Sequence, residues 1–236
     1  MSLFVAIPAY DRKIGGETAS SLLSEQALAN NIGLELKVGI LPGCSLITQA
    51  RNQLCKEFLD SGAAKMIFVD ADVSWEPGAL LKLASQPVEV VGGAYRYKDA
   101  TGKEGYPVGW LPGPLMATDG LIEVASVPGG FLSISRRALE SFKRAFPART
   151  YRAHDEDYFA FFTAPHRDGY LFGEDGAFCH DYRLSGGQIW LDPELTLTHH
   201  DGQYQYKGKI GDYLKVEAAK KKAAANPVEV PEIVQA

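Results

Sequence analysis

The stretch Lys65-Met66-Ile67-Phe68-Val69-Asp70-Ala71-Asp72 decides the fold prediction for this chain of 236 residues. Four apolar residues run directly into two aspartates that are separated by one residue. Such a short apolar run predicts a strand that is buried on both faces, as in a parallel sheet. Ligands of open α/β sheets bind just beyond the carboxyl ends of the strands. We therefore expect the carboxylates to lie beside a ligand. Their oxygen atoms are suitable ligands for Mg²⁺ or Mn²⁺, and such an ion would in turn bind a diphosphate.

The apolar strand is what makes this aspartate pair informative. An Asp-x-Asp triplet alone is usually a solvated turn, and the second one, Asp155-Glu156-Asp157, has no strand before it. After the first triplet, Ser74-Trp75-Glu76-Pro77 predicts the start of a helix. Ser74 would be its N-cap, with Pro77 in the first turn.

Composition indicates an ordinary globular protein with one large domain, since 46% of the residues are apolar and 22% are charged. A net charge of −5 argues against a broad nucleic-acid surface. The three cysteines (Cys44, Cys55 and Cys179) form no Cys-x-x-Cys pair, which favours reduced thiols and a cytoplasmic location. We expect neither a signal peptide nor a membrane span, because no apolar run approaches the roughly 18 residues that a span needs.

Strand-like and helical runs alternate in the first part of the chain, which predicts right-handed βαβ units and a parallel sheet. The later part is expected to be less regular. Strands are predicted at 3–7, 34–41, 65–69, 88–94, 121–127, 131–134, 188–191 and 195–198. Helices are predicted at 17–30, 46–59, 77–84, 136–145, 174–184 and 207–225, an ordered excursion or hairpin at 95–113, and a loop or short helical region at 151–170. The aromatic residues of 95–110 and 151–170 would pack within the protein or stack on sugars or bases.

The predicted fold class is a single Rossmann-like α/β domain. Its mostly parallel central sheet would be flanked by helices and carry a small antiparallel addition. We expect this domain to span residues 1–213. Residues 214–236 would form a C-terminal helix and a loosely ordered tail.

Polar residues follow the first two predicted strands. Pro8-Ala9-Tyr10-Asp11 comes directly after the first strand, and Tyr10 there would either stack on a base or belong to an ordinary turn. Arg51-Asn52 lies on the helix after the second strand. Arg51 would pair with a phosphate or with Asp70, or it would form a surface ion pair.

Two further polar motifs come late in the chain. Glu174 and Asp175 lie at a predicted helix start, where the helix dipole alone would stabilise carboxylates, and Glu156-Asp157 is a competing acidic pair. His199-His200 follows a strand. It would be a surface element, or it would supply a nitrogen ligand to a metal that carboxylates already hold.

In their order along the chain, these motifs resemble those of GT-A glycosyltransferases, particularly the family 2-like group. The resemblance covers roughly residues 3–213 and predicts a GT-A-like domain. The motifs that carry it are Ile7-Pro8-Ala9-Tyr10, Ala50-Arg51-Asn52, Phe68-Val69-Asp70-Ala71-Asp72, Pro128-Gly129-Gly130-Phe131, Gly173-Glu174-Asp175 with Phe178, and His200-Asp201-Gly202.

The resemblance implies a role for each motif. Donor contacts are implied for Pro8, Ala9, Tyr10, Asp11, Arg51, Asn52, Asp70 and Ala71, with Asp70 on the ribose or base side. Gly129 and Gly130 would let the backbone approach the sugar or the acceptor. Asp72 would bind the metal together with His200, with His199 as the alternative. Asp175 would be the catalytic base, with Glu174 second.

The implied reaction is transfer of a sugar from a nucleotide-diphosphate donor, most often a UDP-sugar in this family, to an acceptor hydroxyl. Mn²⁺ or Mg²⁺ would be the cofactor, and a single displacement would invert the anomeric configuration. The acceptor stays open between a glycan, a small molecule, a protein and a nucleic acid. The chain lacks the Gln-x-x-Arg-Trp motif of processive synthases, since Gly186-Gly187-Gln188-Ile189-Trp190 stands in a comparable position.

Two other functions remain open. A nucleotidyltransferase that makes sugar nucleotides would use a similar sheet and metal, with a glycine-rich basic loop directly after the first strand. Here Arg12 and Lys13 are basic, but the pair Gly15-Gly16 comes late. A non-catalytic module that binds a sugar or nucleotide is the third possibility, and the acidic pair at 174–175 speaks against it.

Overall fold

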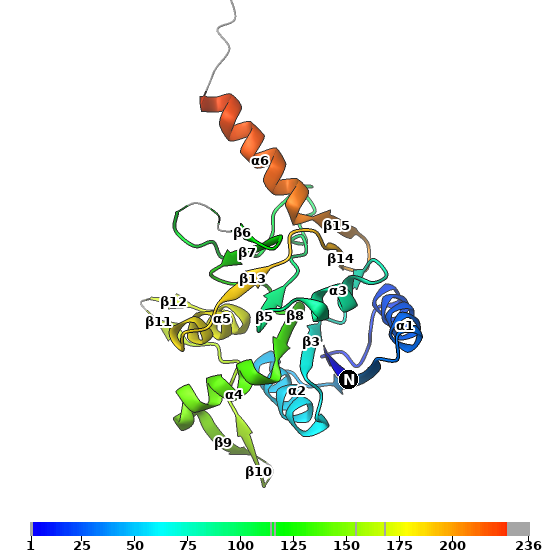
Figure 1. Cartoon of the computed structure of the whole chain (residues 1–236), viewed down its shortest axis with the longest axis vertical. Coiled ribbons are helices and arrows are strands. Elements are labelled where there is room, and N and C mark those ends of the chain that lie inside the picture. The colour runs from blue at the N-terminus through cyan, green and yellow to red at the C-terminus, as the bar shows by residue number, and fades with distance from the viewer. Residues whose placement is uncertain (1, 114, 116, 154, 168, 226–236) are drawn as a thin grey trace, which may run out of the picture.

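An eight-stranded sheet runs through the centre of the protein (Figure 1). The computed structural model describes residues 2–225 except 114, 116, 154 and 168. From one edge to the other, the strands are Glu35–Pro42 (β2), Ser2–Ala9 (β1), Lys65–Val69 (β3), Phe131–Ser135 (β8), Val90–Gly92 (β5), Ile189–Leu191 (β13), Leu121–Val124 (β7) and Ala117–Thr118 (β6).

Strand direction confirms a mostly parallel sheet. Among these eight strands, only β8 and β7 run against the common direction of the other six. The first three strands are parallel neighbours joined by helices Gly16–Asn31 (α1) and Ile47–Ser61 (α2), which are the predicted βαβ units. The predicted fold class, an α/β domain with a small antiparallel addition, is confirmed.

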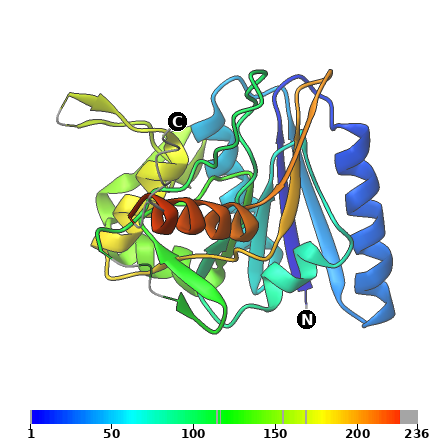
Figure 2. The same cartoon turned by 90° about the horizontal axis from the view of Figure 1, so that it is seen from above.

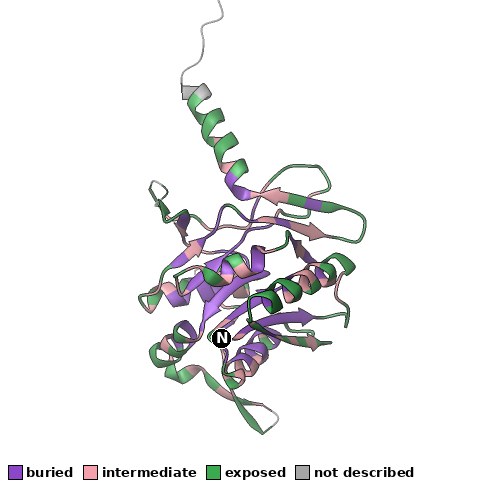
Figure 3. Ribbon diagram, turned by 45° about the vertical axis from the view of Figure 1, so that its right-hand side comes forward, coloured by how far each residue is buried: buried purple, intermediate pink, exposed green. Residues whose placement is uncertain are grey.

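Alternate residues of the central strands supply two separate cores, one on each face of the sheet. On β3, Met66 and Phe68 belong to the core beneath α2, whereas Ile67 and Val69 belong to the opposite core. All four side chains are fully buried. Figure 3 shows buried residues, in purple, along the strands at the centre of the molecule. Figure 2 shows α1 on one side of the sheet and the yellow helix Glu174–Leu184 (α5) on the other. The apolar run 66–69 is therefore buried on both faces, as predicted.

The reversed strand β8 brings the Pro128-Gly129-Gly130 segment to the functional edge of the sheet. Because β8 is antiparallel to β3, Phe131 at its start pairs with Val69 at the end of β3. The amide of Asp70 donates to the carbonyl of Gly130 across a 3.0 Å hydrogen bond. The two glycines therefore lie beside the first aspartate of the Asp-x-Asp motif.

A second, antiparallel sheet places the late histidines beside that motif. It contains the strands Val73–Trp75 (β4), Thr196–His200 (β14) and Gln205–Lys209 (β15), with β14 in the middle. His199 pairs with Val73, and the amide of His200 donates to the carbonyl of Asp72 at 2.9 Å. Residues more than a hundred positions apart in the sequence thus meet just beyond β3.

The prediction that Ser74 caps a helix is wrong, because residues 73–75 form strand β4. The helix Ala79–Ser85 (α3) begins later, after Gly78 in the left-handed conformation at φ 87°. In its first turn, the free amide of Leu80 donates to the carboxylate of Glu25 from α1 at 3.2 Å. The same carboxylate oxygen accepts from Trp75 Nε1, also at 3.2 Å. A carboxylate from another helix therefore replaces the local cap.

Other helix predictions were more accurate. The helices Arg136–Ala145 (α4) and α5 occupy the predicted residues, and the side chain of Ser135 caps α4 by accepting from the amide of Ala138 at 3.0 Å. The predicted helix at 207–225 is shorter, since β15 extends to Lys209 and the helix Ile210–Ala225 (α6) follows it.

The region 151–170 was predicted as a loop or short helix, and this was wrong. It contains two hairpins, formed by Thr150–Ala153 (β9) with Glu156–Phe159 (β10) and by His166–Arg167 (β11) with Tyr170–Leu171 (β12), after a short 3₁₀ turn at Pro147–Arg149. The end of the predicted tail, 226–236, lies outside the described residues. Within the described part of the chain, no helix combines the length and apolarity that crossing a membrane requires.

Glu25 generates a prediction about stability and pH. Burial raises the pKa of its carboxyl, and the surrounding N–H donors only partly offset this effect. Since the folded state then binds the proton more tightly than the unfolded state, the free energy of unfolding should fall as the pH rises from about 4.5 towards the raised pKa. In Glu25→Gln this decline should be absent. Urea unfolding between pH 4 and 8 measures it, with Glu140→Gln on the exposed face of α4 as the control, and equal slopes would contradict the prediction.

Candidate functional site

A cleft of ≈ 690 Å³ opens at the carboxyl ends of β1 and β3. Open α/β sheets bind their ligands at this edge. Among the residues singled out from the sequence, those lining it are Pro8, Tyr10, Asp11, Arg51, Asp70, Ala71, Asp72, Glu174 and His200. Another cavity, of ≈ 510 Å³ beside Arg137, Tyr182 and Trp190, is lined by none of the candidates.

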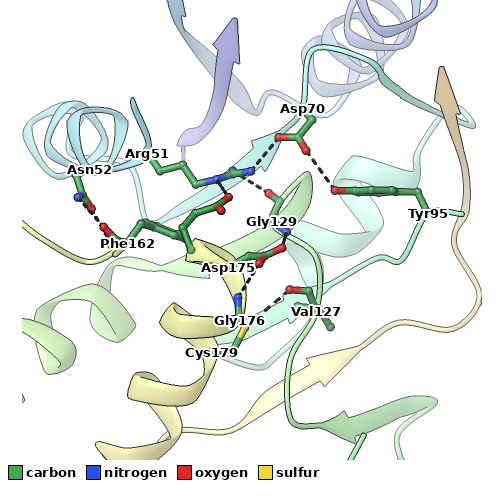
Figure 4. Close-up of polar contacts among 11 residues, drawn as sticks. Arg51, Asn52, Asp70, Tyr95, Val127, Gly129, Phe162, Asp175, Gly176 and Cys179 are labelled. Atoms are coloured by element: carbon green, nitrogen blue, oxygen red, sulfur yellow. Dashed lines mark hydrogen bonds and ion pairs between the residues drawn. The ribbon is translucent and has the colours of Figure 1, made fainter. Parts of the chain in front are cut away.

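Arg51 connects the two acidic motifs behind the cleft (Figure 4). Its Nη2 donates to Asp70 Oδ1 at 2.9 Å, and its Nε donates to Glu174 Oε1 at 3.2 Å. Its Nη1 donates to the carbonyl of Gly129 at 3.0 Å. The guanidinium also lies over the ring of Phe68, 4.9 Å from the centroid. Only 3% of this side chain is exposed, so it holds α2, β3 and α5 together from the inside.

The charges of this cluster support one another electrostatically. Burial acts to lower the pKa of Arg51, but Asp70 and Glu174 outweigh it and the pKa is raised. Tyr95 donates its hydroxyl to Asp70 Oδ2 at 3.2 Å. Burial and the negative charge of Asp70 raise the pKa of Tyr95 well above its ordinary value, so the phenol stays a hydrogen-bond donor.

Close approach explains why glycines precede β8. A Cβ on Gly130 would lie 2.2 Å from Asp70 Oδ2 and 2.6 Å from the Tyr95 hydroxyl. A Cβ on Gly129 would lie 2.8 Å from Arg51 Nη2. Both glycines therefore leave room for polar side chains of the protein itself, and the expected approach of a sugar or an acceptor to their backbone stays a prediction.

The two carboxylates at the start of α5 have different partners. Glu174 is held by Arg51. Asp175 accepts hydrogen bonds from two neutral backbone amides, that of Gly129 at 3.2 Å to Oδ2 and that of Gly176 at 2.7 Å to Oδ1 (Figure 4). The acidic pair therefore lies at the same edge of the sheet as the Asp-x-Asp motif, and Arg51 joins the two. The competing carboxylates Glu156 and Asp157 are exposed on a separate hairpin.

Asp72 faces two basic side chains. Lys98 Nζ lies 2.5 Å from its Oδ2, and His199 Nε2 lies 3.7 Å from the same oxygen. Burial raises the pKa of Asp72, but His199 and Lys98 lower it by more, to about 2. The carboxylate is thus ionised at any physiological pH.

Adjacent histidines on β14 point to different partners. The Nδ1 of His199 lies 3.0 Å from the carbonyl of Arg96, and its ring packs on Tyr95 with centroids 4.6 Å apart. The ring of His200 instead lies beside Ser74, with Nε2 2.8 Å from Oγ. His199 is therefore the histidine whose ring nitrogen faces Asp72.

The donor set at Asp72 fits a divalent ion that shares its coordination with a phosphate. Because the carbonyl of Arg96 can only accept, His199 donates from Nδ1, and a metal held between His199 and Asp72 would take the Nε2 lone pair of the neutral ring, as in metal-binding histidines. In the described residues, no three His, Cys, Asp or Glu side chains converge on one point. Mg²⁺ sites commonly use one or two carboxylates plus substrate phosphates, so Asp72 would supply the carboxylate and His199 a nitrogen ligand beside it.

Six sequence candidates do not line the cleft, namely Ala9, Asn52, Gly129, Gly130, Asp175 and His199. Two of them, Asn52 and Ala9, make their polar contacts elsewhere. Both polar atoms of the Asn52 side chain bond to the backbone of Phe162, with Nδ2 donating at 2.9 Å and Oδ1 accepting at 2.8 Å. Ala9 is buried, and its carbonyl accepts from the amides of Arg12 and Gly43. Neither residue lines the cleft, and these polar atoms already have partners, so neither belongs to the proposed ligand set.

Sequence reasoning did not single out Lys98, and it considered Tyr95 only among the aromatic residues of its segment. Both follow β5, in the segment 95–113 that was expected to be an ordered excursion or hairpin. The strand-end rule that selected the residues after the first and third strands would have selected these as well, because β5 runs in the same direction.

Comparisons with known proteins found similarity among solved structures. No family model and no curated protein matches the chain. The crystal structure of A197 from STIV is similar with a TM-score of 0.53 and 20% identity over 85% of each chain, and this similarity shows the fold alone. The catalytic domain of Drosophila β1,4-galactosyltransferase 7 in complex with xylobiose gives a TM-score of 0.44 and 15% identity over 81% of this chain and 64% of that one. S. aureus TarS 1–349 gives a TM-score of 0.45 and 16% identity over 97% of this chain and 67% of that one.

The close approach at Gly130 leads to a stability prediction. Gly130→Ala should lower the free energy of unfolding by about 1–3 kcal/mol, because the new methyl group displaces the Asp70 carboxylate or the Tyr95 hydroxyl. Gly176→Ala is the matched control. A Cβ there meets nothing within 4 Å, and alanine favours a helix over glycine by about 0.5–1 kcal/mol. Denaturant unfolding compares the two, and equal stabilities would refute the steric role of Gly130.

Proposed function

We propose that this protein is a metal-dependent glycosyltransferase, which moves a sugar from a nucleotide-diphosphate donor, most simply a UDP-sugar, to an acceptor hydroxyl. The observation that carries the proposal is the meeting of Asp72, His199 and the carboxylates of α5 at one sheet edge. A donor bound there would have its diphosphate near Asp72 and its sugar towards Asp175. The resemblance of the motif order to GT-A glycosyltransferases supports the same assignment.

One end of the cleft would bind the base of the donor, and the other end would bind the metal. Tyr10 is 71% exposed at the end of β1, where its ring would stack on the base of the donor. Pro8, Asp11 and Ala71 line the cleft beside it. Asp72 and His199 would hold Mn²⁺ or Mg²⁺, which when bound supplies positive charge against the departing diphosphate.

Asp175 is the carboxylate that we assign as general base. It would take the proton from the acceptor hydroxyl as that oxygen attacks the anomeric carbon, and a single displacement inverts the configuration. The amides of Gly129 and Gly176 would hold its carboxylate in position during this step. Glu174 is the second candidate, but its ion pair with Arg51 favours a positioning role.

The base assignment predicts a split between binding and turnover. Asp175→Asn should lower transfer by about 10²–10⁴-fold, because the amide cannot accept the proton, while donor affinity stays within a fewfold of the wild type. Nucleotide release in the presence of Mn²⁺ and a panel of nucleotide sugars measures turnover, and calorimetry measures binding. Asp157→Asn on the β9–β10 hairpin is the control and should keep full turnover. Wild-type turnover in Asp175→Asn would refute the assignment.

The histidine assignment predicts a difference between neighbours. His199→Gln should weaken Mn²⁺-dependent donor binding by about tenfold or more, whereas His200→Gln should change it less, since its ring faces Ser74. Calorimetric titration of the donor with and without Mn²⁺ measures both variants. The opposite ranking would restore His200 as the ligand.

A nucleotidyltransferase is the second candidate, favoured by Lys13, which lines the cleft directly after β1. The two reactions differ in their products. Release of a nucleoside diphosphate from a nucleotide sugar supports transfer, whereas pyrophosphate exchange with a nucleoside triphosphate supports nucleotidyl transfer. Binding of nucleotide sugars without either product would indicate a non-catalytic module.

A further inference from the structure

Lys98 enters the cleft from a well-anchored segment. The amide of Tyr97 donates to the carbonyl of Gly105 at 2.9 Å, and Asp99 Oδ1 accepts from the amide and the hydroxyl of Thr101. Tyr95 before this loop and Tyr106 after it are both buried. Lys98 is therefore presented to Asp72 by an ordered turn, unlike a lysine on an unconstrained surface loop.

The ammonium group of Lys98 lies against the Asp72 carboxylate at this end of the cleft. It lies 2.5 Å from Asp72 Oδ2, the oxygen that His199 Nε2 also faces. A divalent ion held by Asp72 and His199 would have to bind near that same oxygen. Two cations at such a separation repel strongly, so the ammonium and the metal cannot share the site.

The side chain of Lys98 is able to leave. About one third of it is exposed, and a lysine side chain has four rotatable bonds. Lys98 lines the same cleft as Lys13 and Arg51, so a released ammonium stays within the volume that a diphosphate would fill. A phosphate oxygen offers it a charge-assisted hydrogen bond in place of the one it gives up.

We propose that Lys98 neutralises Asp72 when no metal is bound and that the divalent metal displaces it. The displaced ammonium group then binds the diphosphate of the donor. The second half of this inference rests on the proposed function, because it takes a nucleoside diphosphate as the ligand. The first half concerns the metal and Asp72 alone. Exchange of this kind makes metal binding weak in the absence of nucleotide and strong in its presence.

The test is a titration of Mn²⁺ that is followed by the electron paramagnetic resonance of free Mn²⁺, without and with UDP. In Lys98→Met, Mn²⁺ alone should bind about two- to fivefold more tightly than in the wild type, because its competitor is gone. With UDP present, the same variant should bind UDP about tenfold or more weakly, because it lacks the released ammonium. Lys103→Met, which changes an exposed lysine of the same segment, is the matched control and should match the wild type in both titrations.

The two titrations separate the possible failures. Unchanged or weaker Mn²⁺ affinity in Lys98→Met without nucleotide overturns the exchange, as does the absence of Mn²⁺ binding by both proteins. Tighter Mn²⁺ binding with unchanged UDP affinity overturns the contact with the diphosphate. If the wild type binds no nucleotide at all, the proposed function fails, while the titration with Mn²⁺ alone still decides whether Lys98 competes for Asp72.

Discussion

The buried guanidinium of Arg51 is the constraint on which the rest of the site depends. Removing a charge from water costs several kcal/mol, and the cost is offset only when hydrogen bonds and opposite charges surround the ion. Here Asp70 and Glu174 supply the charges, and the carbonyl of Gly129 supplies a further acceptor. These partners come from three separate segments of the chain, so each segment must adopt its position for the others to be satisfied. The relative placement of the two acidic motifs follows from this requirement.

A second constraint comes from strand pairing. β4 is only three residues long, yet it pairs with β14 and so brings His199 beside Asp72. The pairing explains why the residues after Asp72 form a strand although their composition favours a helix start. It also leaves the first turn of α3 without a local cap, which Glu25 replaces. Thus one long-range interaction, between β4 and β14, accounts for both the histidine contact and the failed helix prediction.

The parts of the fold that could be predicted are those specified by neighbouring residues. The strand before Asp70 and the helix that starts at Glu174 carry their signals within a few positions, and both were predicted correctly. The hairpins within 150–171 were missed, because short strands depend on their pairing partners more than on composition. In the site, the carboxylates could be predicted from the strand-end rule. That Lys98 and His199 both face Asp72 could not be predicted, because tertiary packing brings these side chains together.

Motif order alone cannot separate residues that hold the site together from residues that contact a ligand. Arg51 and Gly130 belong to the motifs that resemble glycosyltransferases, and both have complete structural reasons for their identity in the contacts they make inside the protein. Tyr10 has no such reason, because its ring is largely exposed at the cleft. A residue that is exposed in a cleft without a structural partner is the better candidate for ligand contact. Asp72 lies between these cases, since a lysine of the protein neutralises it at the place where a bound metal would do the same.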